Sequence, residues 1–370
     1  MTLKFIDLHL NPEEQGENLS ALMQKYASNI NYVFHLSANI EPVFIQHGQT
    51  SCATRVQNTE FIVRKGQNNF LYLLRLFYDV KKLQPDVVLL HGFLKPHRIL
   101  ILRWILGKHV RMLLQNHGDQ PQKGLRGFFQ KLAARRLHGF LFVSKLQAEP
   151  WMQKYIITNV KKVFTLMEGS TTFQYAEKLT AKKMLDLPST ISFLWVGRLD
   201  KNKDPLAVVS AFGEYFQKYP DHRLYMVYGT DDLLSALQQC IRALNISQQV
   251  ILLGSCSNDQ VMKYMQAADY FVLGSHHEGS GYALCEALAC GTVPIVTNIP
   301  SFKQMCNDEL FAYLFEPGNS DNLKRILFSL NVHDWQNRST LARNQFEKAL
   351  SFQAIGNNLS EIILSLGLVK

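Results

Sequence analysis

Short apolar runs alternate with longer helix-like stretches along most of the chain, and this alternation constrains the fold more than any other feature. Each run ends in glycine or a polar residue. The runs occupy residues 86–92, 110–118, 139–144, 191–199, 222–229, 250–255, 270–275 and 292–298. This pattern is typical of parallel strands that are buried on both faces and joined by crossover helices. Because the runs form two successive sets, the sequence predicts two doubly wound α/β domains.

The chain length and the polar segment between the two sets define the domains that we expect. A chain of 370 residues is long enough for two hydrophobic cores. Residues 165–190 are polar, and only helix-like patterns remain after residue 330. We therefore predict a first domain over residues 1–170 and a second over 171–350. A C-terminal helix over 351–370 is expected to pack on the first domain.

The composition indicates a globular protein, with 47% hydrophobic and 19% charged residues. No apolar run reaches the roughly 18 residues of a transmembrane helix, and the first residues lack a signal-peptide pattern. The six cysteines form no CxxC pair. They predict reduced thiols, not a disulfide framework or a zinc site. We expect a cytoplasmic protein.

Positive charge is concentrated in the first half of the chain. Residues 1–190 contain 25 Lys and Arg against 13 Asp and Glu, whereas the remainder contains 14 against 17. Residues 95–111 and 123–140 interleave basic with aromatic and aliphatic side chains, as does a helix that lies on an anionic bilayer. Ordinary helices with solvated basic residues would give the same pattern. No nucleic-acid-binding motif accompanies these segments, so the expected anionic partner is the inner membrane face.

The segment "VGRLDKNKDP" places two cations just after a predicted strand. Arg198 follows the strand directly, and Lys203 lies five residues later, ahead of a predicted helix. In doubly wound sheets, ligands bind beyond the carboxyl ends of the strands. Arg198, through its planar guanidinium, and Lys203, as a point charge, could therefore clamp a diphosphate. A solvated pair of loop cations is the alternative.

The segment "EGSGYALCEALACG" combines a glycine turn with two carboxylates. Gly279 and Gly281 allow a ligand to approach the backbone, and a helix that begins near residue 282 offers free N–H groups to a phosphate. Glu278 and Glu286 flank this turn and are suited to accept hydrogen bonds from sugar and ribose hydroxyls. A carboxylate inside an apolar helix needs a partner. For Glu286 that partner is either a ligand or a Lys or Arg side chain.

Together these residues resemble the family-4 retaining glycosyltransferases of GT-B fold, also called group 1. "VGRL" with its lysine is followed about 75 residues later by two glutamates separated by seven residues and then by A-x-A-C-G and a strand. "LFVSKLQAEPWM", "VFTLMEGSTTF" and "ILLGSCSNDQVMKYMQAAD" are similar to further segments of that family. The resemblance covers residues 110–355. It implies two Rossmann-like domains that face across a cleft.

The resemblance implies that the chain transfers a hexose from a UDP- or GDP-linked sugar to a glycan or lipid-linked acceptor in cell-surface polysaccharide synthesis, with retention and without cofactor or metal. The implied catalytic residues are Glu278, His117, Arg198 and Lys203. Donor-binding residues implied by it are Gly197, Arg198, Lys203, Gly254, Ser255, Glu278, Gly279, Ser280, Gly281, Tyr282 and Glu286. Asp231 and Asp232 are interpreted as a helix cap and first-turn acid and not as metal ligands.

Three features depart from the family pattern. Asp204 follows Lys203 where the family usually has a glycine. Ser280 stands where the family usually has a bulky residue, and the first loop contains only Gly16 where the family usually has a glycine pair. Two alternatives therefore stay open. The first is a nucleotide-sugar epimerase or a phosphorylase on the same fold, and the second is a degenerate GT-B subunit without activity.

Overall fold

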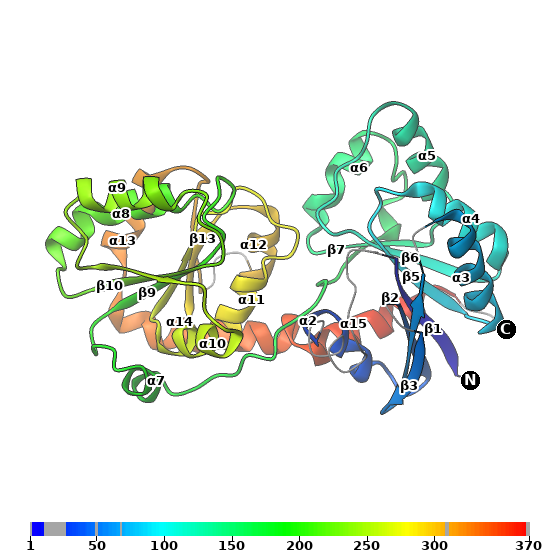
Figure 1. Cartoon of the computed structure of the whole chain (residues 1–370), viewed down its shortest axis with the longest axis horizontal. Helices are drawn as coiled ribbons and strands as arrows, with labels where there is room; N and C mark the ends of the chain where they lie inside the picture. The colour runs from blue at the N-terminus through cyan, green and yellow to red at the C-terminus, as the bar shows by residue number, and fades with distance from the viewer. Residues whose placement is uncertain (1, 11–26, 49–50, 67–68, 308–310, 368–370) are drawn as a thin grey trace. The chain divides into compact units, whose positions relative to one another are not determined.

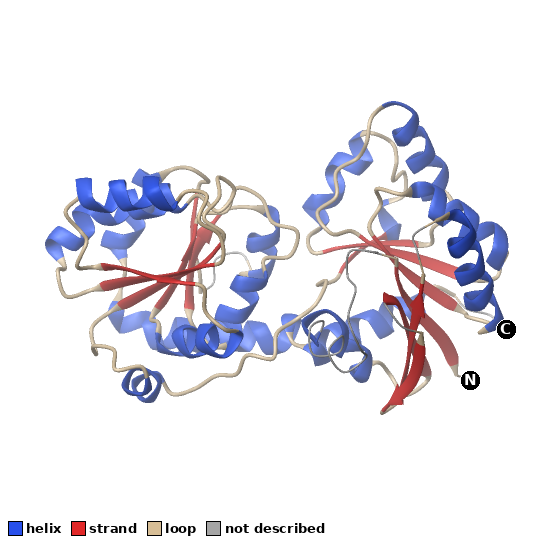
Figure 2. Ribbon diagram, viewed as in Figure 1, coloured by secondary structure: helices blue, strands red, loops and turns tan. Residues whose placement is uncertain are grey.

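The computed structural model describes residues 2–10, 27–48, 51–66, 69–307 and 311–367. It divides the chain into two compact units (Figures 1 and 2). The first unit consists of residues 1–170 together with 352–370, and the second of residues 171–351. Each unit is built on one sheet.

An eight-stranded sheet forms the centre of the first unit. Its strands are β1 (Leu3–His9), β2 (Ile40–Gly48), β3 (Cys52–Val56), β4 (Thr59–Lys65), β5 (Val87–His91), β6 (Arg111–Gln115), β7 (Gly139–Phe142) and β8 (Val163–Thr165). Their order is β3-β4-β2-β1-β5-β6-β7-β8, and every pair is parallel except the β3–β4 hairpin at one edge. The central strand β1 pairs with β5 so that Leu8 lies opposite Leu90. Both side chains are buried, as expected for a sheet covered on both faces.

Helices cover both faces of this sheet (Figure 2). They are α2 (Ala27–Ile30), η1 (Asn31–His35), α3 (Phe70–Lys82), α4 (Pro96–Leu106), α5 (Gly124–Ala134), η2 (Lys145–Ala148), α6 (Glu149–Gln153), η3 (Val160–Lys162) and α15 (Phe352–Ser365). Local sequence explains their limits. Asn69 caps α3 by accepting a hydrogen bond from the amide of Tyr72, and α4 begins with Pro96 and ends before Gly107, whose φ of +78° favours glycine.

The last helix, α15, belongs to the first unit although it follows the second unit in sequence. Ile355, Leu359 and Ile363 are buried on one face. The hydroxyl of Ser360 accepts a hydrogen bond from the amide of Ser37 at 2.9 Å. A Cβ at Gly356 would lie 2.7 Å from the backbone of His35, so the close approach of α15 to η1 requires glycine.

The second unit contains a fully parallel six-stranded sheet. Its strands are β9 (Ser192–Gly197), β10 (Arg223–Tyr228), β11 (Val250–Gly254), β12 (Tyr270–Leu273), β13 (Val293–Thr297) and β14 (Tyr313–Phe315), in the order β11-β10-β9-β12-β13-β14. The surrounding helices are α7 (Lys178–Met184), α8 (Pro205–Lys218), α9 (Leu234–Ala243), α10 (Asn258–Ala267), α11 (Tyr282–Ala289), α12 (Pro300–Met305), α13 (Ser320–Ser329), η4 (Val332–Asp334), α14 (Trp335–Gln345) and the π-helical turn η5 (Phe346–Leu350). Phe193, Trp195 and Phe271 are fully buried in the core.

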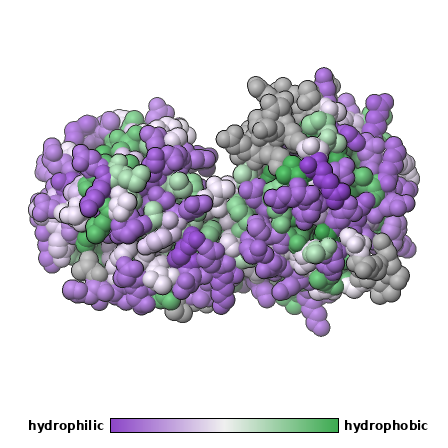
Figure 3. All heavy atoms as spheres, turned by 90° about the horizontal axis from the view of Figure 1, so that it is seen from below, coloured by the Kyte–Doolittle hydropathy of each residue, from purple (hydrophilic) through white to green (hydrophobic). Residues whose placement is uncertain are grey.

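The structure confirms the two doubly wound α/β domains and all eight predicted strands. Sequence analysis did not identify β1–β4, β8 and β14. All six cysteines are free. Within the described part of the chain, no helix has both the length and the apolar character needed to cross a bilayer. Hydrophilic side chains predominate on the face drawn in Figure 3, where hydrophobic ones gather only in small patches.

Candidate functional site

The strand order of the second unit brings two candidate loops together. From β9 the chain continues outward to β10 and β11 and then returns to β12, which pairs with the other side of β9. Loops that follow two such strands flank the crevice in which doubly wound sheets bind ligands. Here they are the loop of Arg198 and Lys203 and the loop of residues 274–281.

Asn202 joins these two loops. Its side chain amide donates a hydrogen bond to the carbonyl of His277 at 3.0 Å and accepts one from the amide of His277 at 3.0 Å. The carbonyl of Asn202 accepts a further bond from the amide of His276 at 2.8 Å. The His276 ring lies 3.0 Å from the carboxylate of Asp204, which also caps α8. These bonds fix the position of one strand-end loop against the other.

Lys203 and Glu278 form an ion pair across the joined loops. Both side chains are largely buried, so removal of either one would leave an uncompensated charge. The two predicted site residues are thus brought together, although sequence analysis assigned them to different parts of a donor. Arg198 lies on the same loop, is 66% exposed, and contacts Asp200 through its Nε at 3.2 Å. Its guanidinium is accessible to a ligand.

The glycine turn is shaped by Gly281, which precedes α11 with a φ of +78°. A Cβ at this position would lie 2.5 Å from the ring of Phe302. Glycine is therefore required both for the backbone conformation and for the packing of α12 against the turn. Ser280 is buried, and its hydroxyl has no hydrogen-bond partner among the described residues. Gly279 and Tyr282 flank this turn, and α11 begins here without a side-chain cap.

Glu286 lies in the second turn of α11, as predicted. No described Lys or Arg forms an ion pair with it, so the alternative of a structural partner finds no support in the described residues. Burial raises the pKa of its carboxyl group to about 7. A largely buried carboxylate without a protein partner is typical of a ligand-binding position.

Other predicted donor residues lie farther along the sheet. Gly197 ends β9, and a Cβ there would approach the Lys203 side chain at 3.4 Å. Gly254 ends the edge strand β11 and Ser255 follows it, so β10 and β9 separate both from the loop of Glu278.

The interpretation of Asp231 and Asp232 as a cap was wrong. Helix α9 begins after Leu233 without a side-chain cap, and only the backbone carbonyl of Asp231 accepts a bond, from the amide of Leu234.

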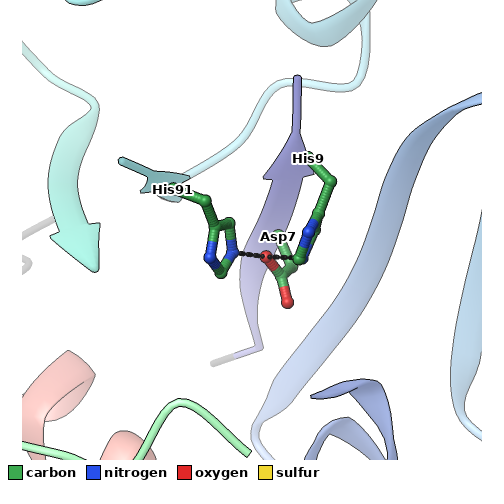
Figure 4. Close-up of side chains that lie close together, drawn as sticks. All are labelled: Asp7, His9 and His91. Atoms are coloured by element: carbon green, nitrogen blue, oxygen red, sulfur yellow. Dashed lines mark hydrogen bonds and ion pairs between the residues drawn. The ribbon is translucent and has the colours of Figure 1, made fainter. Parts of the chain in front are cut away.

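A second group of polar side chains lies at the corresponding position of the first unit. There β1 and β5 are neighbouring strands. After β1 the chain adds strands toward one edge of the sheet, and after β5 it adds strands toward the other edge. His9 ends β1 and His91 ends β5, and both approach the buried carboxylate of Asp7 (Figure 4). His117 follows β6. We call these residues, together with Glu168, the histidine cluster.

The histidine cluster is linked by short hydrogen bonds. Glu168 Oε2 lies 2.7 Å from His117 Nδ1, His117 Nε2 lies 2.9 Å from His91 Nδ1, and His91 Nε2 lies 2.6 Å from Asp7 Oδ1. The Tyr32 hydroxyl donates to the other oxygen of Asp7. This network holds His117, the predicted first-domain site residue, between Glu168 and His91.

Protonation in the histidine cluster follows from burial and charge. Burial alone would raise the pKa of Asp7, but the charges of His9 and His91 and the hydrogen bond of His91 hold it well below its usual range. Burial and the charge of His9 lower the pKa of His91 to about 3. Burial would also lower the pKa of His117, yet the hydrogen bond and charge of Glu168 raise it. Of His91 and His117, it is therefore His117 that becomes protonated more readily.

The histidine cluster opens into a cavity of about 380 Å³ within the first unit. His9, His91, His117 and Glu168 line one part of it, and Lys95 and Arg98 line another. Apolar side chains, including Phe44 and Leu90, complete the wall. The cavity combines charged groups with an apolar surface, as binding sites for amphipathic molecules do.

Sequence analysis missed Asp7, His9, Tyr32 and Glu168. The only available signal was the acid and imidazole of "IDLH" at the end of an apolar run. Gly16 and most of the first loop, which departs from the family pattern, lie outside the described residues.

Comparisons with known proteins agree with the predicted family. Residues 181–347 match the family model "Glycosyl transferases group 1". Alpha-monoglucosyldiacylglycerol synthase of Streptococcus pneumoniae is 28% identical over 173 residues, which cover 47% of this chain and 38% of that protein. GDP-mannose:cellobiosyl-diphosphopolyprenol alpha-mannosyltransferase of Xanthomonas oryzae is 31% identical over 118 residues, covering 32% and 31%. The alignments thus span less than two fifths of these curated relatives.

Solved structures match over the whole chain. Sucrose-phosphate synthase from Thermosynechococcus elongatus aligns over 99% of both chains with a TM-score of 0.70 and 16% identity. Anabaena HepE in complex with UDP and glucose covers 99% of this chain and 100% of its own, with a TM-score of 0.68 and 15% identity. At this identity the likeness establishes the fold, and it confirms the predicted GT-B architecture.

Proposed function

We propose that the second unit, in which residues 181–347 match the group 1 glycosyltransferase model, is a domain of that family, and that the protein transfers a hexose from a nucleotide-diphosphate sugar to a glycan or lipid-linked acceptor. One observation carries the proposal. The joined loops after β9 and β12 gather Arg198, Lys203 and Glu278 at the point of the sheet where ligands bind.

We assign the diphosphate to Arg198, Lys203 and the N-terminal end of α11, whose dipole favours an anion. A donor that reaches Lys203 would compete with Glu278 for the ammonium group, which frees the Glu278 carboxylate to accept hydrogen bonds from the sugar. Glu286 would accept bonds from the ribose hydroxyls. His117 of the first unit stays a predicted catalytic residue. Glu168 and His91 engage both of its ring nitrogens, so contact with a sugar hydroxyl would require the exchange of the bond to His91.

These groups would act mainly on the leaving group. When the bond from the anomeric carbon to the diphosphate breaks, negative charge grows on the leaving oxygen, and the two cations and the helix N-terminus stabilise it. In the retaining mechanism that we adopt, the acceptor oxygen attacks from the same face. The acceptor proton passes to an oxygen of the leaving diphosphate, so this step requires neither a general base nor a metal from the protein.

Three observations support the choice of substrates. One solved neighbour is titled as a complex with UDP and glucose, and one relative is named for GDP-mannose. Two relatives have lipids in their names, a monoglucosyldiacylglycerol and a cellobiosyl-diphosphopolyprenol. The exposed face of α5 carries Leu125, Phe128 and Phe129 among basic residues, which suits a protein that works on the inner face of an anionic membrane.

The test begins with a thermal-shift panel of UDP, GDP, ADP and their sugars, followed by transfer assays on the donors that bind. Arg198→Ala is the decisive variant, because the exposed side chain forms an ion pair with Asp200 alone among the described residues and its loss leaves packing intact. We expect kcat to fall about 10²–10³-fold. Lys203→Ala should act similarly, with its melting temperature measured because Glu278 loses its partner.

Asp231→Ala is the matched control, since its carboxylate neither caps α9 nor belongs to the joined loops. Equal rates for Arg198→Ala and Asp231→Ala would contradict the proposal. Conversion of the donor sugar without an acceptor would favour an epimerase, and phosphate-dependent release of sugar would favour a phosphorylase. Stable binding to a partner protein without any turnover would favour a non-catalytic subunit.

A further inference from the structure

Three potential metal ligands converge where β1 and β5 end in the first unit. They are Asp7 Oδ1, His9 Nε2 and His91 Nε2, and all three atoms lie within 4.8 Å of one another (Figure 4). Asp7 is 1% exposed, and the two imidazoles are mostly buried. We propose that these three residues bind a divalent transition-metal ion of the Zn²⁺ class.

The ring of His9 supplies the first argument. Its Nε2 lies 3.0 Å from Asp7 Oδ1, but it is buried and has no hydrogen bond of acceptable geometry to any described residue. A buried polar atom without a partner requires an explanation. An ion between the ring nitrogen and the carboxylate would provide the missing bond.

The spacing of the ligand atoms is close to what such an ion needs. Zinc bonds to histidine nitrogen and carboxylate oxygen are about 2.0–2.1 Å long, so ligand atoms around a tetrahedral ion lie about 3.3 Å apart. The corresponding distances from Asp7 Oδ1 are 3.0 Å to His9 and 2.6 Å to His91. Binding requires the carboxylate oxygen to move by less than 1 Å from each imidazole nitrogen, which small changes of side-chain torsion angles allow.

The hydrogen bonds around the three ligands have the arrangement that supports metal-bound histidine. With an ion on Nε2, neutral His91 would donate its Nδ1–H to His117 Nε2, and His117 would donate its Nδ1–H to Glu168. Every ring nitrogen in that chain then has one partner. Tyr32 fixes the second oxygen of Asp7. Partners of this kind orient the ligands and raise metal affinity.

The ligand set also indicates which ions bind and which further ligand the bound ion could coordinate. Two imidazoles and one carboxylate favour Zn²⁺, Fe²⁺ or Co²⁺, whereas Mg²⁺ and Ca²⁺ prefer oxygen ligands alone. Three protein ligands leave a coordination position for a water molecule or a substrate oxygen. His9 and His91 line the cavity of the first unit, so that position would face it.

This inference does not depend on the proposed transfer reaction. None of the three ligands belongs to the donor-binding residues of the second unit, and metal binding is measured without turnover. The chain can therefore bind the ion and lack transferase activity, or transfer sugar and bind no ion.

The experiment uses the full chain after treatment with a chelator. Titration calorimetry with Zn²⁺ is expected to give one strongly bound ion per chain, and Co²⁺ is expected to give the visible absorption of a four- or five-coordinate site. Zn²⁺ should raise the melting temperature, and Mg²⁺ should not. His9→Gln should weaken Zn²⁺ binding by at least about 100-fold, since loss of a supporting residue alone costs about 10–100-fold.

His47→Gln is the matched control, because His47 is a buried histidine on β2 of the same sheet and lies outside the ligand set. It should bind Zn²⁺ as the unchanged chain does. Glu168→Gln should give the smaller loss of about 10–100-fold. The melting curve without metal shows whether each variant is folded. A second ligand variant, His91→Gln, can be added, and if it does not fold, His9→Gln alone decides whether the three residues bind the ion. Absence of strong binding, or equal binding by His9→Gln and the unchanged chain, would overturn the proposal.

Discussion

At the scale of single residues, Glu286 shows how a residue proposed to bind a ligand affects the stability of the folded chain. Its carboxyl group is largely buried in α11 and has no described cation beside it, which raises its pKa to about 7. The folded chain therefore holds this proton at pH values where the unfolded chain, with an ordinary glutamate, has already lost it. Between pH 4.5 and 7 the folded state binds more protons, so its stability declines as the pH rises.

Glu286→Gln should remove this pH dependence. Near pH 4.5 the carboxyl group is protonated in the folded state, and the variant should be about as stable as the unchanged chain. At pH 8 the variant should be more stable by up to about 3 kcal/mol, because it avoids a buried charge. Urea denaturation at the two pH values measures this difference. A difference that does not change with pH would contradict the role of burial.

The same variant reports on ligand binding. An amide oxygen still accepts a hydrogen bond but lacks the charge that strengthens bonds from ribose hydroxyls. Under the proposed function, Glu286→Gln is therefore expected to bind nucleotide more weakly at pH 8 while being more stable. Opposite effects on stability and binding are typical of residues kept for function.

At the scale of single elements, α5 has an outer surface that its fold does not need. Leu125 is 78% exposed, and Phe128 and Phe129 are also exposed, whereas Gly127, Gln130 and Ala133 face the core. Residues 123–136 contain five basic residues and no acidic ones. This combination predicts that α5 contacts an anionic bilayer.

The double variant Leu125→Ser with Phe128→Ser should reduce flotation with anionic liposomes by about tenfold or more at low salt, because both the apolar contacts and the helix orientation are lost. The control is Leu179→Ser with Met184→Ser, two exposed apolar residues on α7 of the second unit. High salt should release the unchanged chain by screening. Equal flotation of both double variants would argue against α5 as the contact.

At the scale of the whole molecule, the two units do not follow the simple order of the sequence. Helix α15 comes last in the chain but packs on the first unit through Ile355, Leu359 and Ile363. The stability of the first unit therefore depends on residues that are far from it in sequence.

Two neighbouring positions on α15 test this dependence. Ile363 is fully buried and Leu364 is 46% exposed. Ile363→Ala should destabilise the first unit by about 2–5 kcal/mol through loss of burial and the cavity left behind. Leu364→Ala, the same chemical change on the outer face, should stay within about 0.5 kcal/mol.

Hydrogen exchange locates the effect of each variant. Ile363→Ala should accelerate exchange in β1 and β5 of the first unit and leave β9 and β12 of the second unchanged. Faster exchange in the second unit alone would show that α15 supports the other unit.

The sequence by itself determined the fold class, eight of the strands and the local geometry of the glycine turn in the second unit. Continuous apolar runs indicate strands that are buried on both faces. Such a run is a local property, because it can be recognised within one segment of the sequence. The glycine turn, the start of α11 and the place of Glu286 are likewise local, since Gly281 and the residues around it lie within one short segment. Edge strands such as β3 and β14 were not predicted, because short, half-exposed strands lack a continuous apolar run.

Only the tertiary structure decided which residues meet. Lys203 and Glu278 pair because β9 and β12 are neighbours, and Asn202 joins their loops. Asp7, His9 and His91 meet because β1 pairs with β5 across more than 70 intervening residues. Strand order is set by the competition of all strands for neighbours and of all helices for faces of the sheet. No single segment contains that information, so the histidine cluster became visible only in the folded chain.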